Sequence, residues 1–168
     1  MKMSSKQVTQ IPKLLQSLIA LVTFRLGTHL REQTDLLRIE ARHQSRHCLY
    51  WIRVYGDEQI QKELVNQEYG RVLSITFSTA GGVGEEKDEE IKDGLNYIQY
   101  FLGELYQGRN DNYDYDDDVD WYTSFQPLPL LARRTEEQIE EVGAIEEIET
   151  QINNNGLNWN IKGDANNA

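Results

Sequence analysis

From residue 13 to residue 51 the chain has a single glycine, Gly27, and no proline. Glycine and proline are the residues that most often interrupt a helix, so this stretch favours long helices. Gly27 is a natural break, which predicts one helix over residues 12–26 and a second over residues 28–52. The aromatic and β-branched residues of 49–55 leave a strand there as the alternative.

The same stretch carries two separate stripes of like side chains. When residues are spaced at about 100° each, five apolar residues fall within an arc of about 60° and five arginines within an arc of about 80°. We expect the apolar stripe to face the core and the arginine stripe to face solvent. The apolar stripe is Leu26, Leu30, Leu37, Ala41 and Cys48, and the arginine stripe is Arg31, Arg38, Arg42, Arg46 and Arg53.

The rest of the chain mixes helix and strand signals. Asp57 suits a helix cap before the apolar turn Ile60, Leu64 and Val65, and residues 85–106 form a predicted helix buried through Ile91, Leu95, Ile98, Leu102 and Leu105. Tyr69–Ala80, rich in β-branched and aromatic residues, is the predicted central strand. Thr135 and Gln138 match a capping box that would open a last helix before a short strand, Leu157–Ile161.

These elements predict an α+β fold that is helix-dominated, with a long N-terminal helix or helical hairpin packed on a small sheet and a central helix. At 168 residues, one domain with tails is the expected organisation. The predicted parts are a disordered N-terminus (1–10), an α+β core (11–107), an acidic, Tyr-rich loop with a Pro-containing docking strip (108–133), a C-terminal helix and short strand (134–162), and a disordered tail (163–168).

Charge is divided by position. Residues 1–56 hold nine Lys and Arg but three Asp and Glu, whereas residues 57–168 hold eight basic and 25 acidic residues, for a net charge of −11. A basic front on an acidic body suggests a polyanion or acidic partner for the arginine stripe. The alternatives are a solvated helix face and pairing within the chain, for which the candidate partners are Glu86, Asp88, Glu89 and Glu90.

Arg42, His43 and His47 form an Arg-His-x3-His string with R-x4-H spacing. In this spacing the segment resembles the active-site motif of HEPN-type ribonucleases, although Leu49 stands where antitoxin-linked members place a tyrosine. The resemblance implies Arg42 as electrostatic stabiliser and His47 as acid or base acting on RNA, and it defines a second functional hypothesis. The two histidines are four residues apart, but without a third ligand we predict no metal.

An acidic, aromatic segment lies beside a proline-constrained apolar strip in residues 111–131. Six aspartates between residues 111 and 120 suggest a third function, that of an acidic inhibitor mimicking nucleic acid. The strip can lie over the core of its own chain or dock on a neighbouring subunit. The predicted docking residues are Tyr113, Tyr115, Trp121, Tyr122, Phe125, Pro127 and Pro129.

The first functional hypothesis is a non-enzymatic subunit of a larger protein or nucleoprotein assembly. It binds partner subunits in a homo- or hetero-oligomer, with nucleic acid as a further partner of the basic helix, and it uses no cofactor. The single cysteine, Cys48, excludes an intramolecular disulfide and fits a reducing, cytoplasmic location. The apolar stretch 14–26 is too short to span a bilayer, so no membrane role is expected.

Overall fold

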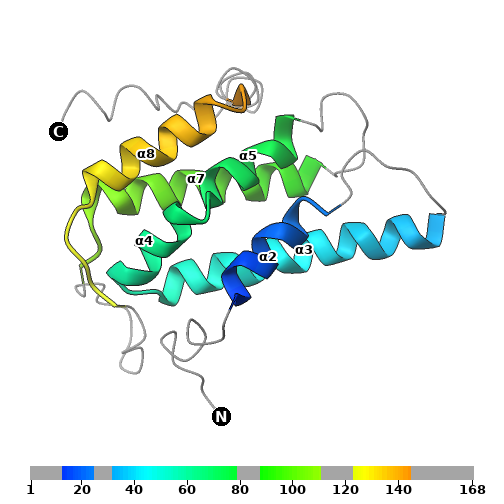
Figure 1. The fold of residues 1–168 in the computed structure, drawn as a ribbon, viewed down its shortest axis with the longest axis horizontal. Helices are drawn as coiled ribbons and strands as arrows, with labels where there is room; N and C mark the ends of the chain where they lie inside the picture. The colour runs from blue at the N-terminus through cyan, green and yellow to red at the C-terminus, as the bar shows by residue number, and fades with distance from the viewer. Residues whose placement is uncertain (1–12, 25–31, 79–87, 111–122, 145–168) are drawn as a thin grey trace, which may run out of the picture.

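The computed structural model describes residues 13–24, 32–78, 88–110 and 123–144. Six helices form this part of the chain: α2 (Leu14–Val22), α3 (Glu32–Tyr55), α4 (Glu58–Asn66), α5 (Tyr69–Ser78), α7 (Asp88–Gln107) and α8 (Pro129–Glu140). Figure 1 shows α2 lying against α3 on one side, α5, α7 and α8 grouped on the other, and α4 joining them. The N-terminal end of α3 reaches past the other helices.

The predicted α+β fold class is wrong for the described residues, which contain helices and no strand. A lone antiparallel bridge joins Arg109 to Phe125, whose backbone N–H and C=O groups exchange hydrogen bonds of 2.8 and 3.0 Å. The segment predicted as the central strand is helix α5. The predicted strand over residues 157–161 lies outside the described residues.

Helix α5 forms where strand propensity predicted otherwise because its burial follows the helical period. Tyr69, Val72 and Leu73, spaced three and four residues apart, all lie in the core. Gly70 meanwhile allows α8 to approach closely, since a Cβ built there would lie 2.5 Å from the Thr135 Cγ2 atom. Packing on two sides of the segment therefore overrides the β-branched composition that suggested a strand.

The N-terminal elements follow the prediction closely. Helices α2 and α3 fall within or near the predicted ranges, and residues 49–55 continue α3 instead of forming a strand. Asp57 caps α4 as predicted, because its carboxylate accepts a hydrogen bond of 3.2 Å from the Ile60 backbone N–H. None of the described helices combines the length and apolarity needed to cross a membrane.

The core lies where α3, α4, α5 and α7 meet. The predicted inner face of α7 is confirmed at Ile98, Leu102 and Leu105, whereas Leu95 is half-buried and the Ile91 side chain lies outside the described set. The remaining fully buried apolar side chains include Leu49, Leu64, Leu73 and Phe101. Burying these groups from several helices is the main term that holds the fold together.

Helix α8 closes the core through polar as well as apolar contacts. Thr135 and Gln138, predicted as a capping box, lie instead inside α8 and are buried. The Gln138 side-chain amide donates a 3.0 Å hydrogen bond to the Val65 carbonyl. Tyr106 on α7 donates a 2.8 Å hydrogen bond to Glu136, and burial together with this bond raises the pKa of Tyr106 to about 12.

Tyr69 makes the stability of this core sensitive to alkaline pH. Burial raises the pKa of its hydroxyl above the ordinary value of 10.0, with the neighbouring Arg53 acting in the opposite direction. The folded chain therefore keeps a proton that the unfolded chain loses. Stability is fully present below pH 10.0 and falls above it, by about 1.4 kcal/mol per pH unit until the folded-state pKa is reached.

We therefore expect Tyr69→Phe to remove this part of the alkaline loss of stability and to leave the part that the raised pKa values of Tyr97 and Tyr106 contribute in the same way. At neutral pH the variant should be as stable as the parent or about 1 kcal/mol more stable, because the buried hydroxyl has no hydrogen-bond partner among the described atoms. Urea unfolding of both proteins at neutral pH and above pH 10.0 tests this. Equal losses of stability at high pH in the two proteins would contradict the assignment to Tyr69.

Candidate protein-docking face on helix α3

The arginine stripe lies inside the molecule. Arg38, Arg42, Arg46 and Arg53 do share one side of α3 as predicted, but all four are buried and Arg42 has an exposed fraction of 0%. Arg31 lies outside the described residues. The prediction that these guanidinium groups face solvent is therefore wrong for the four described arginines, and they form no basic surface.

Carboxylates of the same chain pair with two of these arginines, which supports the intramolecular alternative. Arg38 contacts Asp35 one turn earlier at 2.7 Å, and Arg53 contacts Glu104 of α7 at 2.6 Å. The aliphatic part of an arginine side chain packs in an apolar interior while its charged end finds a partner. Binding of nucleic acid stays a prediction that the placement of these four side chains does not support.

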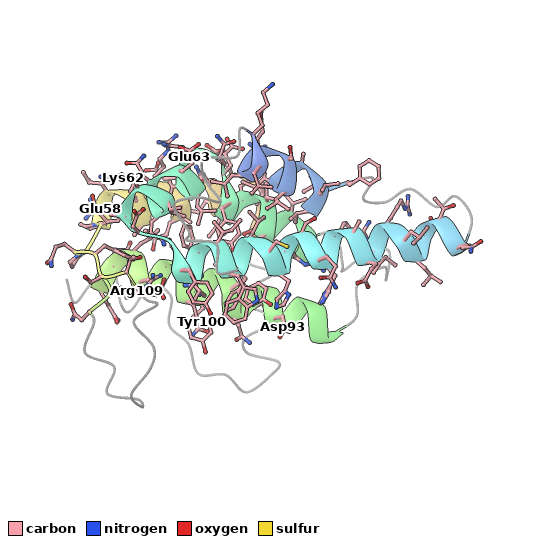
Figure 2. The ribbon with its side chains drawn as sticks, turned by 90° about the horizontal axis from the view of Figure 1, so that it is seen from below. Glu58, Lys62, Glu63, Asp93, Tyr100 and Arg109 are labelled. Atoms are coloured by element: carbon pink, nitrogen blue, oxygen red, sulfur yellow. The ribbon has the colours of Figure 1, made fainter. Side chains whose placement is uncertain are left out.

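Arg109 holds the C-terminal end of α3. Its Nη1 atom donates to the carbonyls of Val54 at 2.8 Å and Gly56 at 3.2 Å, and its Nη2 atom donates to the carbonyl of Arg53 at 3.2 Å. Nη2 also donates to the Glu104 carboxylate at 2.6 Å, so one carboxylate bridges Arg53 and Arg109. Figure 2 shows Arg109 near this end of α3. A cation here offsets the negative end of the helix dipole.

The opposite side of α3 is exposed and almost uncharged. Leu36 and Leu37 have exposed fractions of 63% and 68%, and Trp51 has 40%. Leu37 and Cys48, which the apolar stripe predicted to be buried, are both exposed. We call this surface the α3 outer face; it consists of Gln33, Leu36, Leu37, Glu40, Gln44, His47, Cys48 and Trp51.

Ring contacts fix the aromatic end of the α3 outer face. The Trp51 Nε1 atom donates a 2.8 Å hydrogen bond to the Nε2 atom of His47, and the Trp51 ring stacks on Tyr55 with centroids 5.5 Å apart. Tyr50 stacks on Tyr97 of α7 at 4.5 Å, at the border where Figure 2 shows Tyr100 and Asp93. Because Trp51 is already oriented, a partner that contacts it loses little side-chain entropy.

The residues of the ribonuclease hypothesis do not converge. Arg42 is buried on one side of α3, whereas His47 is exposed on another and bonded to Trp51. A phosphate in contact with His47 is therefore out of reach of Arg42 as it is placed. Within the described residues, no three His, Cys, Asp or Glu side chains are grouped as a metal ion requires. Ribonuclease activity stays a prediction.

The proline strip divides into a buried and an exposed part. Phe125 is buried with the Arg109 guanidinium 4.9 Å from its ring centroid, which favours the internal role for this residue. Pro127 and Pro129 are exposed, and Pro129 begins α8. The predicted docking residues Tyr113, Tyr115, Trp121 and Tyr122 lie outside the described residues, as does the acidic tract.

Comparisons with known proteins give no information about the function of this chain. No family model matches this chain, and neither a curated protein nor a solved structure matches it. The candidate site therefore depends on the chain's own geometry. One signal in the sequence could have indicated the α3 outer face. Four uncharged residues fall on one side of a helix that is otherwise rich in arginine: Gln33, Leu37, Gln44 and Trp51.

Proposed function

We propose that this protein is a non-enzymatic subunit that binds other protein subunits through the α3 outer face. The observation that carries the proposal is the distribution of side chains on α3. This helix buries its arginines and exposes Leu36, Leu37 and Trp51. Leu36 and Leu37 are adjacent, and Trp51 lies 14 residues after Leu37 on the same side of α3. Exposed large apolar side chains that gather on one face favour a protein-binding surface. An amphipathic helix presents such residues to a partner with matching apolar side chains.

The chemistry of the surface favours a protein over nucleic acid as partner. Glu40 is the only formally charged residue in the α3 outer face, and the whole chain has a net charge of −11, which repels phosphates. Trp51 is of the residue type that most often dominates binding energy at protein interfaces. A protein subunit with an apolar contact surface is therefore the partner that best fits the α3 outer face.

The double substitution Leu36→Glu/Leu37→Glu tests this function. We expect it to abolish complex formation, because it places two charges in an apolar contact, while changing the free energy of unfolding by about 0.5 kcal/mol or less at these exposed positions. The tagged chain is isolated from its native cells, and the mass of the eluted complex is measured by light scattering.

A matched control is available on another helix. Leu130 at the start of α8 has an exposed fraction of 79%, so Leu130→Glu makes the same chemical change away from α3. This variant should keep the partners of the parent chain. Partners that survive in the double variant but are lost in Leu130→Glu would move the binding surface to the proline strip and refute the assignment to α3.

A further inference from the structure

We propose that a second copy of this chain binds the α3 outer face, with the two α3 helices antiparallel and Gln44 of each at the two-fold axis. This inference rests on the proposed function and names one partner for it. The spacing, the charge and the size of the α3 outer face support it.

Six of the eight residues of the α3 outer face recur at alternating steps of four and three, and Leu36 and Cys48 lie beside them. A 3.5-residue repeat keeps the same stripe, the seam of a helix pair, facing a partner helix. Leu37 and Trp51 are the apolar positions of this stripe, and the other four positions are polar. The seam residues are Gln33, Leu37, Glu40, Gln44, His47 and Trp51, and all of them are exposed. The repeat spans most of α3, whose 24 residues extend for about 36 Å.

Antiparallel pairing about Gln44 makes this seam complementary to itself. Leu37 lies seven residues before Gln44 and Trp51 lies seven residues after it, so Leu37 of each copy meets Trp51 of the partner subunit. Glu40 lies close to His47 of the partner subunit, where a carboxylate and an imidazole can form a hydrogen bond. The Gln44 Nε2 atom donates a 2.7 Å hydrogen bond to Glu40 of its own chain. Its second N–H and its carbonyl oxygen are left to bond Gln44 of the partner subunit at the axis, which fixes the register.

Parallel pairing of the same faces is disfavoured by charge. It would place the two Glu40 carboxylates beside each other within the contact, and like charges at an interface are costly. It would also place the two Trp51 side chains against each other at one end of the contact and the two Leu37 side chains at the other. The helices would then be held further apart at the tryptophan end than at the leucine end. The isologous, antiparallel arrangement avoids both and needs one surface patch, as in most homodimers.

The expected dimer is a weak one. A strip about 36 Å long and about 10 Å wide covers less than the roughly 800 Å² that each partner contributes to a standard interface. We therefore expect a dimer that dissociates on dilution through the micromolar range. In both views the N-terminal end of α3 extends clear of the other described helices (Figures 1 and 2).

Sedimentation velocity over a range of concentrations is the first test. The full chain should shift from monomer to dimer as its concentration rises. Leu37→Glu should raise the dissociation constant of the dimer at least tenfold, and Leu130→Glu should leave that constant unchanged. A chain that stays monomeric at every concentration, or a dimer insensitive to Leu37→Glu, overturns the inference. If the chain is monomeric and Leu36→Glu/Leu37→Glu still loses another partner, the proposed function stands without self-association.

Cross-linking tests the register. In a Cys48→Ser background, Gln44→Cys should form a disulfide-linked dimer on mild oxidation, because the two Cβ atoms meet at the axis. Gln33→Cys in the same background should remain monomeric on denaturing gels, as should the parent chain with Cys48 alone. A parallel pair would cross-link Gln33→Cys as readily as Gln44→Cys. That result, or a Gln44→Cys chain that does not cross-link, overturns the antiparallel arrangement.

Discussion

Glu104→Ala should lower the free energy of unfolding by about 3 kcal/mol or more, because it leaves the buried Arg53 and Arg109 without their shared carboxylate. The two guanidinium groups each contact Glu104 Oε2 at 2.6 Å, and the Glu104 side chain is itself only 28% exposed. Two like charges would then face each other in the interior, next to the carbonyls at the end of α3. Urea unfolding followed by circular dichroism measures the loss.

An exposed ion pair provides the control for Glu104. Glu58 pairs with Lys62 on the surface of α4, and both side chains are well exposed, as Figure 2 shows along that helix. Glu58→Ala should change stability by about 0.5 kcal/mol or less, since solvent screens such pairs. If Glu104→Ala costs no more than Glu58→Ala, water must reach the two arginines and the buried cluster does not hold α3 to α7.

Gly70→Ala should lower stability by about 2 kcal/mol, because the new methyl group overlaps the packed contact between α5 and α8. A Cβ there lies 2.5 Å from Thr135 Cγ2. Thr135 cannot move aside easily, since it is buried and its hydroxyl donates a 2.9 Å hydrogen bond to the Leu131 carbonyl. Helix α8 would have to shift as a unit.

The same substitution at Gly103 should raise stability, which is the opposite of the effect expected at Gly70. A Cβ built at this position in α7 has no other atom within 4 Å, apart from those of its own helix and chain neighbours. Gly103→Ala therefore gains helix propensity of about 1 kcal/mol without a steric cost. Thermal unfolding of the two variants side by side separates packing from propensity. A loss of stability at both positions would contradict the close approach at Gly70.

Local signals were enough to place most of the N-terminal half of the fold. The lack of glycine and proline predicted α3, and the cap at Asp57 predicted α4. Both depend on residues a few positions apart. The interpretation of Tyr69–Ala80 as a strand failed because its helical form depends on contacts with α7 and α8, which composition does not reveal.

The candidate site shows the same limit more sharply. The spacing of the arginines correctly put them on one side of α3, but spacing does not say which side faces the core. That is decided by Glu104, 51 residues along the chain from Arg53, and by the aromatic contacts of Tyr50 with Tyr97. Charged residues were expected outside and leucines inside, as in most helices. The structure instead buries four arginines and exposes Leu36 and Leu37, and Arg53 has its partner on another helix.

The backbone bridge between Arg109 and Phe125 makes the packing of the helices independent of the number of residues between these two positions. Both hydrogen bonds of the bridge lie within the described residues, and Gly108, at φ 74°, provides the turn that leads into it. Once the ends are fastened in this way, an insertion in the intervening segment costs only the slowly growing entropy of closing a longer loop. The helical body can therefore keep its packing when this segment changes in length.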